Sequence, residues 1–328
     1  MGVLVCGGAG YIGSHAVAAL LESGREVVVL DNLEKGKRAA VTPPAKLYQG
    51  DLRDPDCPER VFAENEIDAV IHFAAYSLVG ESVAEPEKYY HNNVYGTQCL
   101  LAAMRKHGVR KLVFSSTAAV YGQPERLPIS EDQATLPTSP YGETKLAVEK
   151  MLGWYDRAYG IKYIALRYFN VAGARAGGEI GEDHNPETHL IPILLGVALG
   201  KADHVKIFGG DYDTPDGSCI RDYIHVCDLI DAHLLALDAL CPPDAQSKIY
   251  NLGYGHGFSN LEIVEAARRV TGHPIPVEMA PRRPGDPSTL IASPAAAIRE
   301  LGFSPKRDNL DEIIASAWAF HRAHPNGL

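Results

Sequence analysis

The sequence lacks both a block of basic residues and a long apolar run. Its 328 residues carry a formal net charge of −10, which argues against nucleic acid or an anionic membrane as the main partner. The chain shows no apolar stretch long enough to span a membrane, and it does not open with the basic segment and apolar core of a secretory signal. We therefore expect a cytoplasmic protein with no nucleic-acid and no membrane partner.

Cysteines are also few, and their spacing fits neither a disulfide framework nor a zinc site. None of the six forms a C-x-x-C pair, which is typical of proteins in a reducing compartment. The thirteen histidines show no metal-ligand spacing either. The sequence therefore predicts no metal site.

What the sequence does contain begins with a glycine-rich turn. Residues 2–6 have the pattern of a short buried strand, and Gly7, Gly10 and Gly13 follow at once and lead into an apolar helix over residues 12–21. Glycines at this spacing permit a tight turn and a close approach of the backbone to a pyrophosphate, which the helix N-terminus then faces. This order of elements predicts a dinucleotide site.

An acidic residue at the end of the next expected strand indicates which dinucleotide. The strand covers residues 26–30 and ends at Asp31, 21 residues after Gly10, where a carboxylate can bind the 2′-hydroxyl of an adenosine ribose. Because Asp31 would repel a 2′-phosphate, the pattern predicts NAD rather than NADP.

Strands and helices then alternate along the chain. Further strands are expected over residues 46–49, 69–73 and 111–114, with helices over 57–65 and 85–107. This alternation favours right-handed crossovers and a doubly wound, parallel α/β sheet. In such a sheet the ligand site lies at the carboxyl ends of the strands.

A tyrosine and a lysine share one helix face after the fifth strand. Tyr141 and Lys145 are four residues apart near the start of a helix expected to reach residue 159, so their side chains lie about one turn apart. An unperturbed phenol has a pKa of ~10, so a phenolate base at neutral pH needs about 4 kcal/mol of stabilisation. Lys145 and the positive ring of an oxidised nicotinamide could supply it. Thr117 is the favoured hydroxyl beside them, whereas Ser115 and Ser116 could equally cap a turn.

Motifs along nearly the whole chain carry a family resemblance. In order they are GGAGYIGSH, DNL, GDLRD, HFAA, NNV-x-GT, SST-x-x-VYG, YG-x-TK, LRYFNVAGA, IFG-x-DY-x-TPDG, RDYIHV and RRPGD. This series resembles the UDP-glucose 4-epimerases, which are extended members of the short-chain dehydrogenase/reductase superfamily. The resemblance implies a Rossmann domain with tightly held NAD and a smaller α/β domain that binds a UDP-sugar. We expect the NAD-binding domain over residues 1–169, with 226–255 returning to it, and the UDP-sugar domain over 170–328.

The implied reaction is the 4-epimerisation of UDP-galactose to UDP-glucose. Tyr141 would remove the proton of the sugar 4-hydroxyl while C4 passes hydride to NAD, and the 4-keto sugar would turn and take the hydride back on its opposite face. Lys145 would bind the nicotinamide ribose and lower the pKa of the tyrosine. Thr117 would hydrogen-bond the reacting oxygen.

The glycine turn and the resemblance together imply two groups of contact residues. The expected cofactor contacts are Gly7, Gly10, Tyr11, Ile12, Gly13, Asp31, Asn32, Asp51, Leu52, Phe73, Ala74, Ala75, Asn92, Ser115, Tyr141, Lys145 and Tyr168. The expected substrate contacts are Thr117, Asn170, His189, Leu190, Phe208, Arg221, Arg283, Asp286 and Leu290. Among the latter, Arg221 and Arg283 would clamp the diphosphate, and Asp286 would bind the uridine ribose.

Three positions depart from the family pattern. Ser77 stands where a lysine often touches the cofactor, and His189 stands where better-known members have asparagine. Leu290 is intermediate in size between the residues that control the room for an N-acetyl group. UDP-N-acetylglucosamine or a UDP-pentose therefore stays an alternative substrate.

Two further readings use the same fold. A nucleotide-sugar 4,6-dehydratase is disfavoured because Ala118 and Ala119 follow Thr117, where the dehydratase pattern places Asp-Glu to eliminate water. A non-enzymatic NAD-sensing protein would often lack the tyrosine and the lysine that this chain retains. The helices over 85–107 and 141–159 are expected to pair across a two-fold axis in a homodimer, as the family's dimers do.

Overall fold

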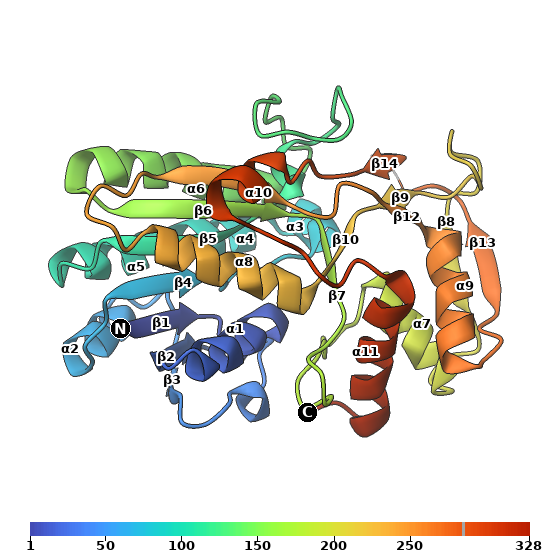
Figure 1. Cartoon of the computed structure of the whole chain (residues 1–328), viewed down its shortest axis with the longest axis horizontal. Helices are drawn as coiled ribbons and strands as arrows, with labels where there is room; N and C mark the ends of the chain where they lie inside the picture. Colours follow the sequence, from blue (N-terminus) through green and yellow to red (C-terminus); the bar gives the residue numbers. More distant parts are fainter. Residues whose placement is uncertain (284–285) are drawn as a thin grey trace.

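The larger part of the fold is a seven-stranded parallel sheet. In the computed structural model, which describes residues 1–283 and 286–328, the strand order is β11-β6-β5-β4-β1-β2-β3 (Figure 1). Every neighbouring pair is parallel. The strands are β1 (Gly2–Cys6), β2 (Glu26–Asp31), β3 (Lys46–Gln49), β4 (Ala69–His72), β5 (Lys111–Thr117), β6 (Lys162–Tyr168) and β11 (Lys248–Leu252). The predicted doubly wound α/β sheet is confirmed.

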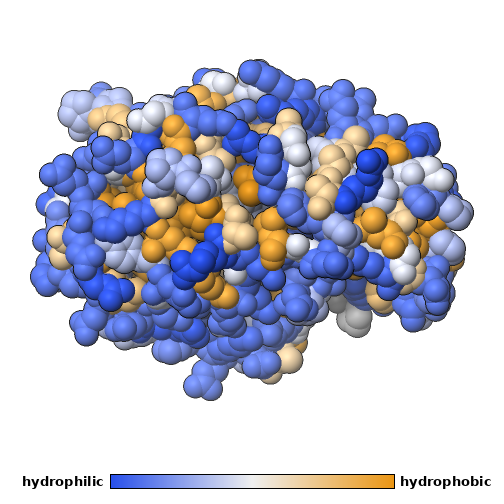
Figure 2. Space-filling model, turned by 90° about the horizontal axis from the view of Figure 1, so that it is seen from below, coloured by the Kyte–Doolittle hydropathy of each residue, from blue (hydrophilic) through white to orange (hydrophobic). Residues whose placement is uncertain are grey.

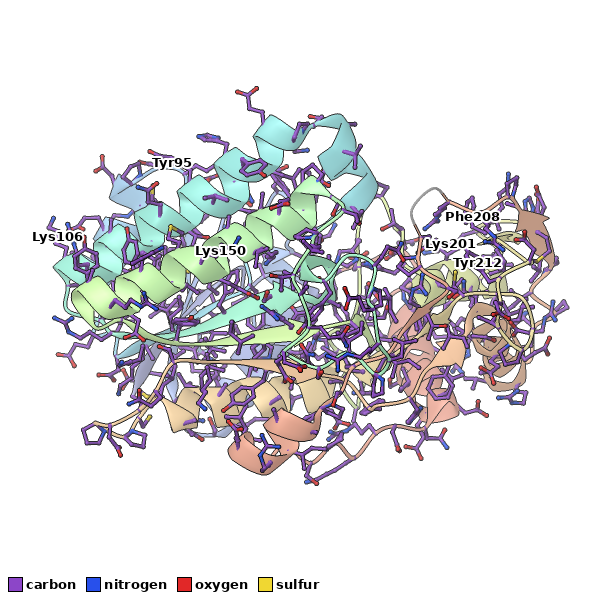
Figure 3. All side chains as sticks on the ribbon, turned by 90° about the horizontal axis from the view of Figure 1, so that it is seen from above. Tyr95, Lys106, Lys150, Lys201, Phe208 and Tyr212 are labelled. Carbon is purple, nitrogen blue, oxygen red and sulfur yellow. The ribbon has the colours of Figure 1, made fainter. Side chains whose placement is uncertain are left out.

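Helices cover both faces of this sheet and give it two cores. One face carries α1 (Tyr11–Glu22), α8 (Val226–Ala239) and α10 (Ala295–Leu301); the other carries α2 (Asp56–Glu64), α5 (Gly96–Lys106) and α6 (Pro140–Tyr159). Figure 3 shows α5 and α6 on one side and α8 on the other. The side chains of β1 alternate between the cores: Val3 and Val5 pack on the side of α1 and α8, whereas Leu4 and Cys6 pack on the side of α2 and α5. A strand buried on both faces is apolar throughout for this reason.

The helix expected over residues 85–107 is present but irregular. It consists of α4 (Pro86–Tyr89), a π-helical turn (Tyr90–Tyr95) and α5, after the short α3 (Val79–Ala84). Asn93, in the π-helical turn, accepts a hydrogen bond from Tyr76 N and donates to Tyr76 O and Thr144 Oγ1. The wider turn thus ties the segment after β4 to the start of α6, which a regular helix pattern does not predict.

The smaller part lies beside the large sheet (Figure 1). Its core is formed by α7 (Leu190–Ala198), α9 (Asn260–Thr271) and α11 (Leu310–Ala323) with the parallel pair β8 (Val205–Phe208) and β13 (Val277–Ala280). Short strands connect the two parts: β7 (Asn170–Ala172) pairs with β10 (Tyr223–His225), and β9 (Ile220–Arg221) lies between β12 (Phe258–Ser259) and β14 (Thr289–Leu290). The remaining helical turns cover residues 38–40 and 118–120.

The outer surface of the molecule is mostly polar. Figure 2, which views the molecule from below, shows a mostly hydrophilic face with apolar patches between the polar residues. Within the part of the chain that the structure describes, no helix combines the length and apolar character that crossing a membrane requires.

A buried ion pair joins α6 to the sheet. Arg167, on β6, donates to both carboxylate oxygens of Glu149, on α6, at 2.9 and 2.6 Å. Ser116 Oγ donates to the same carboxylate at 2.5 Å, and Arg167 Nη1 donates to Tyr121 Oη at 2.8 Å. Both charged side chains are almost fully buried, with 6% and 3% of their surface exposed. The position of α6 therefore depends on a bidentate pair in a site of low polarity.

We expect Arg167→Met to lower the free energy of unfolding by ~3–5 kcal/mol, because it leaves the Glu149 carboxylate buried without its cation. Chemical denaturation monitored by circular dichroism measures the change. The matched control is Arg126→Met, since Arg126 pairs with Asp132 at 3.5 Å with both side chains exposed; it should change stability by less than about 0.5 kcal/mol. Equal effects of the two substitutions would contradict the structural role of the buried pair.

Candidate active site

A cavity of about 380 Å³ opens at the carboxyl ends of the central strands. It is lined by residues that follow β1, β4, β5 and β6 and, on the opposite wall, by the loop that leads into α7. This is the edge at which a doubly wound sheet places its ligand.

The glycine-rich turn forms the floor of the cavity. Gly7 has φ +80°, and a Cβ there would lie 2.6 Å from Ala74 N; a Cβ on Gly13 would lie 2.0 Å from Gly7 O. Both positions thus require glycine for packing within the protein. Gly10 differs, because the nearest atom to its Cβ would be Gly7 O at 3.5 Å, and the residue lines the cavity at the N-terminus of α1. The turn fits a pyrophosphate that approaches the backbone at Gly10.

Two carboxylates lie beside this turn. Asp31 accepts hydrogen bonds from Ala9 N at 3.0 Å and Leu33 N at 2.8 Å, so it ties the glycine turn to the end of β2. Burial raises the pKa of Asp31. Asp51 accepts from Arg53 through both oxygens and from Asn32 Nδ2 at 3.1 Å. The Arg53 guanidinium holds the pKa of Asp51 well below its usual range.

The start of α6 brings Tyr141 to the end of β5. Ser139 is the N-cap, and its hydroxyl accepts from Gly142 N at 3.2 Å. A Cβ on Gly142 would lie 2.5 Å from Ala119 O, so glycine lets the first turn of α6 contact the segment after β5. Thr117 is the last residue of β5 and lines the cavity together with Tyr141, and its hydroxyl lies close enough to the phenol to lower the pKa of Tyr141.

Lys145 lies one turn further along the same helix face. Its Nζ donates to Ser115 O at 2.7 Å and lies 4.9 Å from the ring centroid of Phe114. Burial lowers the pKa of Lys145 to about 7, and Glu149 opposes this effect. Burial also raises the pKa of Tyr141, while the hydrogen bond from Thr117 opposes the rise. Within the protein alone, the pKa of the phenol therefore moves opposite to the expected direction, because desolvation outweighs the opposing interaction with Thr117.

The structure brings most of the predicted residues together. All of the predicted catalytic residues and cofactor contacts line the cavity, and so do the substrate candidates Asn170, His189 and Leu190. Ser77 lines it as well.

Five substrate candidates lie outside the residues that line the cavity: Phe208, Arg221, Arg283, Asp286 and Leu290. Arg221 Nη2 donates to Asp286 Oδ1 at 2.5 Å, and the Arg283 guanidinium lies 4.1 Å from the ring centroid of Phe208. Leu290 packs against the apolar cluster of Val120, Tyr121, Ile129 and Leu146. Figure 3 shows Phe208 in the smaller part of the fold, at the end opposite Lys106.

Sequence reasoning missed several side chains that shape the site. Glu149 lies four residues after Lys145, and this spacing is a signal that could have identified it. Glu182 and His184 also line the cavity. Burial alone would raise the pKa of Glu182, but the His189 and His184 side chains lower it to about 2. Burial lowers the pKa of His184, but the neighbouring Glu182 and Glu187 carboxylates raise it more strongly, to about 10.

Comparisons with known proteins agree with this geometry. A model of the NAD dependent epimerase/dehydratase family matches residues 3–253. The UDP-glucose 4-epimerase of Halalkalibacterium halodurans is 58% identical over 327 residues, which cover 100% of this chain and 97% of that protein. A crystal structure of a UDP-glucose 4-epimerase superposes with a TM-score of 0.98 at 55% identity and covers 100% of this chain and 99% of that chain. The Bifidobacterium longum UDP-glucose 4-epimerase, solved in complex with NAD+ and UDP, superposes with a TM-score of 0.94 at 43% identity over 100% of both chains.

The family model agrees with the sequence relatives and the solved structures over residues 3–253, and the relatives and structures match the whole chain, which belongs to the NAD dependent epimerase/dehydratase family and, within it, to the UDP-glucose 4-epimerases.

Proposed function

We propose that this protein interconverts UDP-galactose and UDP-glucose, with Tyr141 as the base at the 4-hydroxyl of the hexose. Membership of the UDP-glucose 4-epimerase family makes it an NAD-dependent isomerase that acts on UDP-hexoses. The observation that supports the residue roles is the contact of Tyr141 with Thr117 in the cavity that Lys145 and the glycine turn also line.

Each side chain near the reacting carbon has a separate proposed role. As a phenolate, Tyr141 accepts the proton of the 4-hydroxyl and becomes the neutral phenol; it later returns the proton, so it ends each turnover as the phenolate again. Thr117 donates a hydrogen bond to the reacting oxygen. Bound NAD would supply the hydride acceptor and donor for C4 and a positive charge near the phenol. Since burial disfavours the phenolate, the Lys145 ammonium assists by stabilising that charge in a site of low polarity.

We propose that the two ends of the substrate contact different walls. Asn170, His189 and Leu190 line the cavity and are the proposed contacts near the sugar and diphosphate. Arg221 and Arg283 stay proposed diphosphate ligands, and Phe208, Asp286 and Leu290 stay proposed contacts at the uridine and sugar ends. Arg221 would exchange its contact with Asp286 for phosphate oxygens.

The proposed domain division follows the two cores. We assign residues 1–169 to the NAD-binding domain and 170–328 to the UDP-sugar domain, with 226–255 returning to the first. In support, β11 is the edge strand next to β6, and α8 packs on α1 and on β5.

We further propose a cytoplasmic homodimer. All six cysteines are free thiols, which fits a reducing compartment. The outer surface of α6 exposes Trp154 and Tyr159, and Tyr95, beside α5, is also exposed. Figure 3 shows that α5 and α6 run side by side, so the two helices could pair with their copies across a two-fold axis.

Tyr141→Phe should cut turnover by at least ~100-fold, since general base catalysis contributes about that much or more. NMR of the purified enzyme with UDP-galactose and no added NAD should show UDP-glucose for the wild type and almost none for the variant. The control is Tyr159→Phe at the far end of the same helix, where the hydroxyl is distant from the cavity. Unchanged turnover of Tyr141→Phe, with NAD content equal to that of the wild type, would remove Tyr141 from the role of base.

Gly10→Ala should lower the amount of NAD that copurifies while leaving the melting temperature within a few degrees, because its methyl group enters the cavity and not the protein interior. NAD content is read after denaturing the purified protein. Gly153→Ala, whose Cβ would meet Tyr163 Oη at an ordinary 3.7 Å, is the control and should keep its NAD. A Gly10→Ala protein with a full complement of NAD would argue against pyrophosphate binding at this turn.

Trp154→Glu should convert the dimer into a monomer, since a charge on a buried interface side chain is costly. Size-exclusion chromatography with light scattering reports the mass. Ile298→Glu, at another exposed apolar residue, on α10, should leave the mass unchanged. A dimeric Trp154→Glu protein, or a monomeric wild type, would refute this interface.

A further inference from the structure

Two histidines and two glutamates form a cluster in the loop that leads into α7. They are Glu182, His184, Glu187 and His189, and one ligand atom of each lies within 4.8 Å of the others. Glu182 is buried, His184 and Glu187 are partly buried, and His189 is the most exposed of the four. The four residues follow the pattern E-x-H-x-x-E-x-H. Because half of them are glutamates, the pattern does not match the cysteine and histidine spacing typical of zinc sites.

The distances within the cluster approach those of a tetrahedral metal site. His184 Nδ1 lies 3.2 Å from Glu182 Oε1 and 3.7 Å from Glu187 Oε2. His189 Nδ1 lies 3.6 Å from Glu187 Oε1 and 2.6 Å from Glu182 Oε1. Zinc bonds to nitrogen and oxygen of ~2.0–2.2 Å place neighbouring ligands of a tetrahedron ~3.3–3.6 Å apart. Three of the four distances fall within 0.1 Å of this range. Because the two Glu187 distances end on different oxygens, this carboxylate would have to turn to present one oxygen to the ion, and the 2.6 Å contact requires one carboxylate oxygen to move outward.

Two further observations point to a ligand at the centre of the cluster. His184 Nδ1 is buried and makes no hydrogen bond of acceptable geometry with the described residues, although it is directed at two carboxylates. Glu187 Oε1 accepts hydrogen bonds from Thr188 N at 2.7 Å and His189 N at 2.8 Å. These backbone contacts hold the Glu187 carboxylate in place, as outer contacts commonly do for metal ligands.

We propose that Glu182, His184, Glu187 and His189 bind one transition-metal ion of the Zn²⁺ class in tetrahedral geometry. Two imidazole nitrogens and two carboxylate oxygens suit Zn²⁺ and disfavour Mg²⁺ and Ca²⁺, which take oxygen ligands. The two carboxylates balance the charge of a divalent ion bound to neutral imidazoles. Four protein ligands close the coordination sphere, so the ion has a structural role. The His189 ring would then bind the ion, and Asn170 and Leu190 would remain as the substrate contacts of this part of the cavity. The ion fixes residues 182–189 against the start of α7 and so shapes the part of the cavity that this loop lines, where the His184 ring lies 6.3 Å from the ring of Tyr11.

The test uses untagged, NAD-containing enzyme that has been treated with a chelator and passed into metal-free buffer. Titration with Co²⁺ should produce the visible absorption bands of tetrahedral Co²⁺ and saturate at one ion per chain, and Zn²⁺ should then displace the Co²⁺ and abolish the bands. Zn²⁺ should also raise the melting temperature of the wild type. Mg²⁺ should do neither.

His184→Ala and Glu187→Ala each remove one ligand and should weaken Co²⁺ binding by at least ~10-fold. Circular dichroism verifies that both variants are folded. The matched control is His204→Ala, because His204 forms an exposed pair with Glu278 at 2.8 Å; it should bind Co²⁺ as the wild type does. Absence of the tetrahedral bands in the wild type, or wild-type affinity in His184→Ala and Glu187→Ala, would overturn the proposal.

Discussion

The contact between α6 and the end of β5 is the constraint on which the site depends. Three residues on one face of α6 make it: Gly142 approaches Ala119 O, Lys145 donates to Ser115 O, and Glu149 accepts from Ser116. Positions three and four residues apart share a helix face, so the same face that docks the helix also carries the reactive phenol. Any shift of α6 would break a buried hydrogen bond or the pair with Arg167 as well as move Tyr141.

This docking places two ionisable groups in a site that disfavours both of their charged forms. Burial raises the pKa of Tyr141 and lowers that of Lys145 to about 7. In surroundings of low polarity, a positive charge near the phenol has a larger effect than it would have in water. The arrangement therefore suits a reaction in which the cation that completes the site belongs to a bound cofactor. It also explains why the phenol needs a hydroxyl partner, Thr117, held at the end of a central strand.

The loop before α7, which belongs to the smaller part, lines the cavity with a different kind of side chain. The large part lines the cavity with the glycine turn and with aromatic and hydroxyl side chains that follow its strands, whereas the loop before α7 presents opposed charges that lie close to one another. The arginines at the far end are each engaged with a partner, Asp286 or Phe208. These contacts can be exchanged for others without moving the backbone, whereas the glycine turn depends on backbone packing that tolerates little change.

The sequence by itself determined the local features of the site, and the tertiary structure decided its long-range contacts. The glycine turn, Asp31, the alternation of strands and helices, and the Tyr141–Lys145 spacing are local patterns, and local geometry is sufficient to place each of them at one edge of a parallel sheet. Three other contacts join residues that are distant in the sequence. Arg221 and Asp286 are 65 residues apart, Glu149 and Arg167 are 18 apart, and Asn93 and Thr144 are 51 apart. The direction of the pKa shift of Tyr141 likewise depends on burial, which arises only when distant elements pack together. Spacing along a chain determines which residues share a face, but only the folded chain decides what each face meets and how much water remains there.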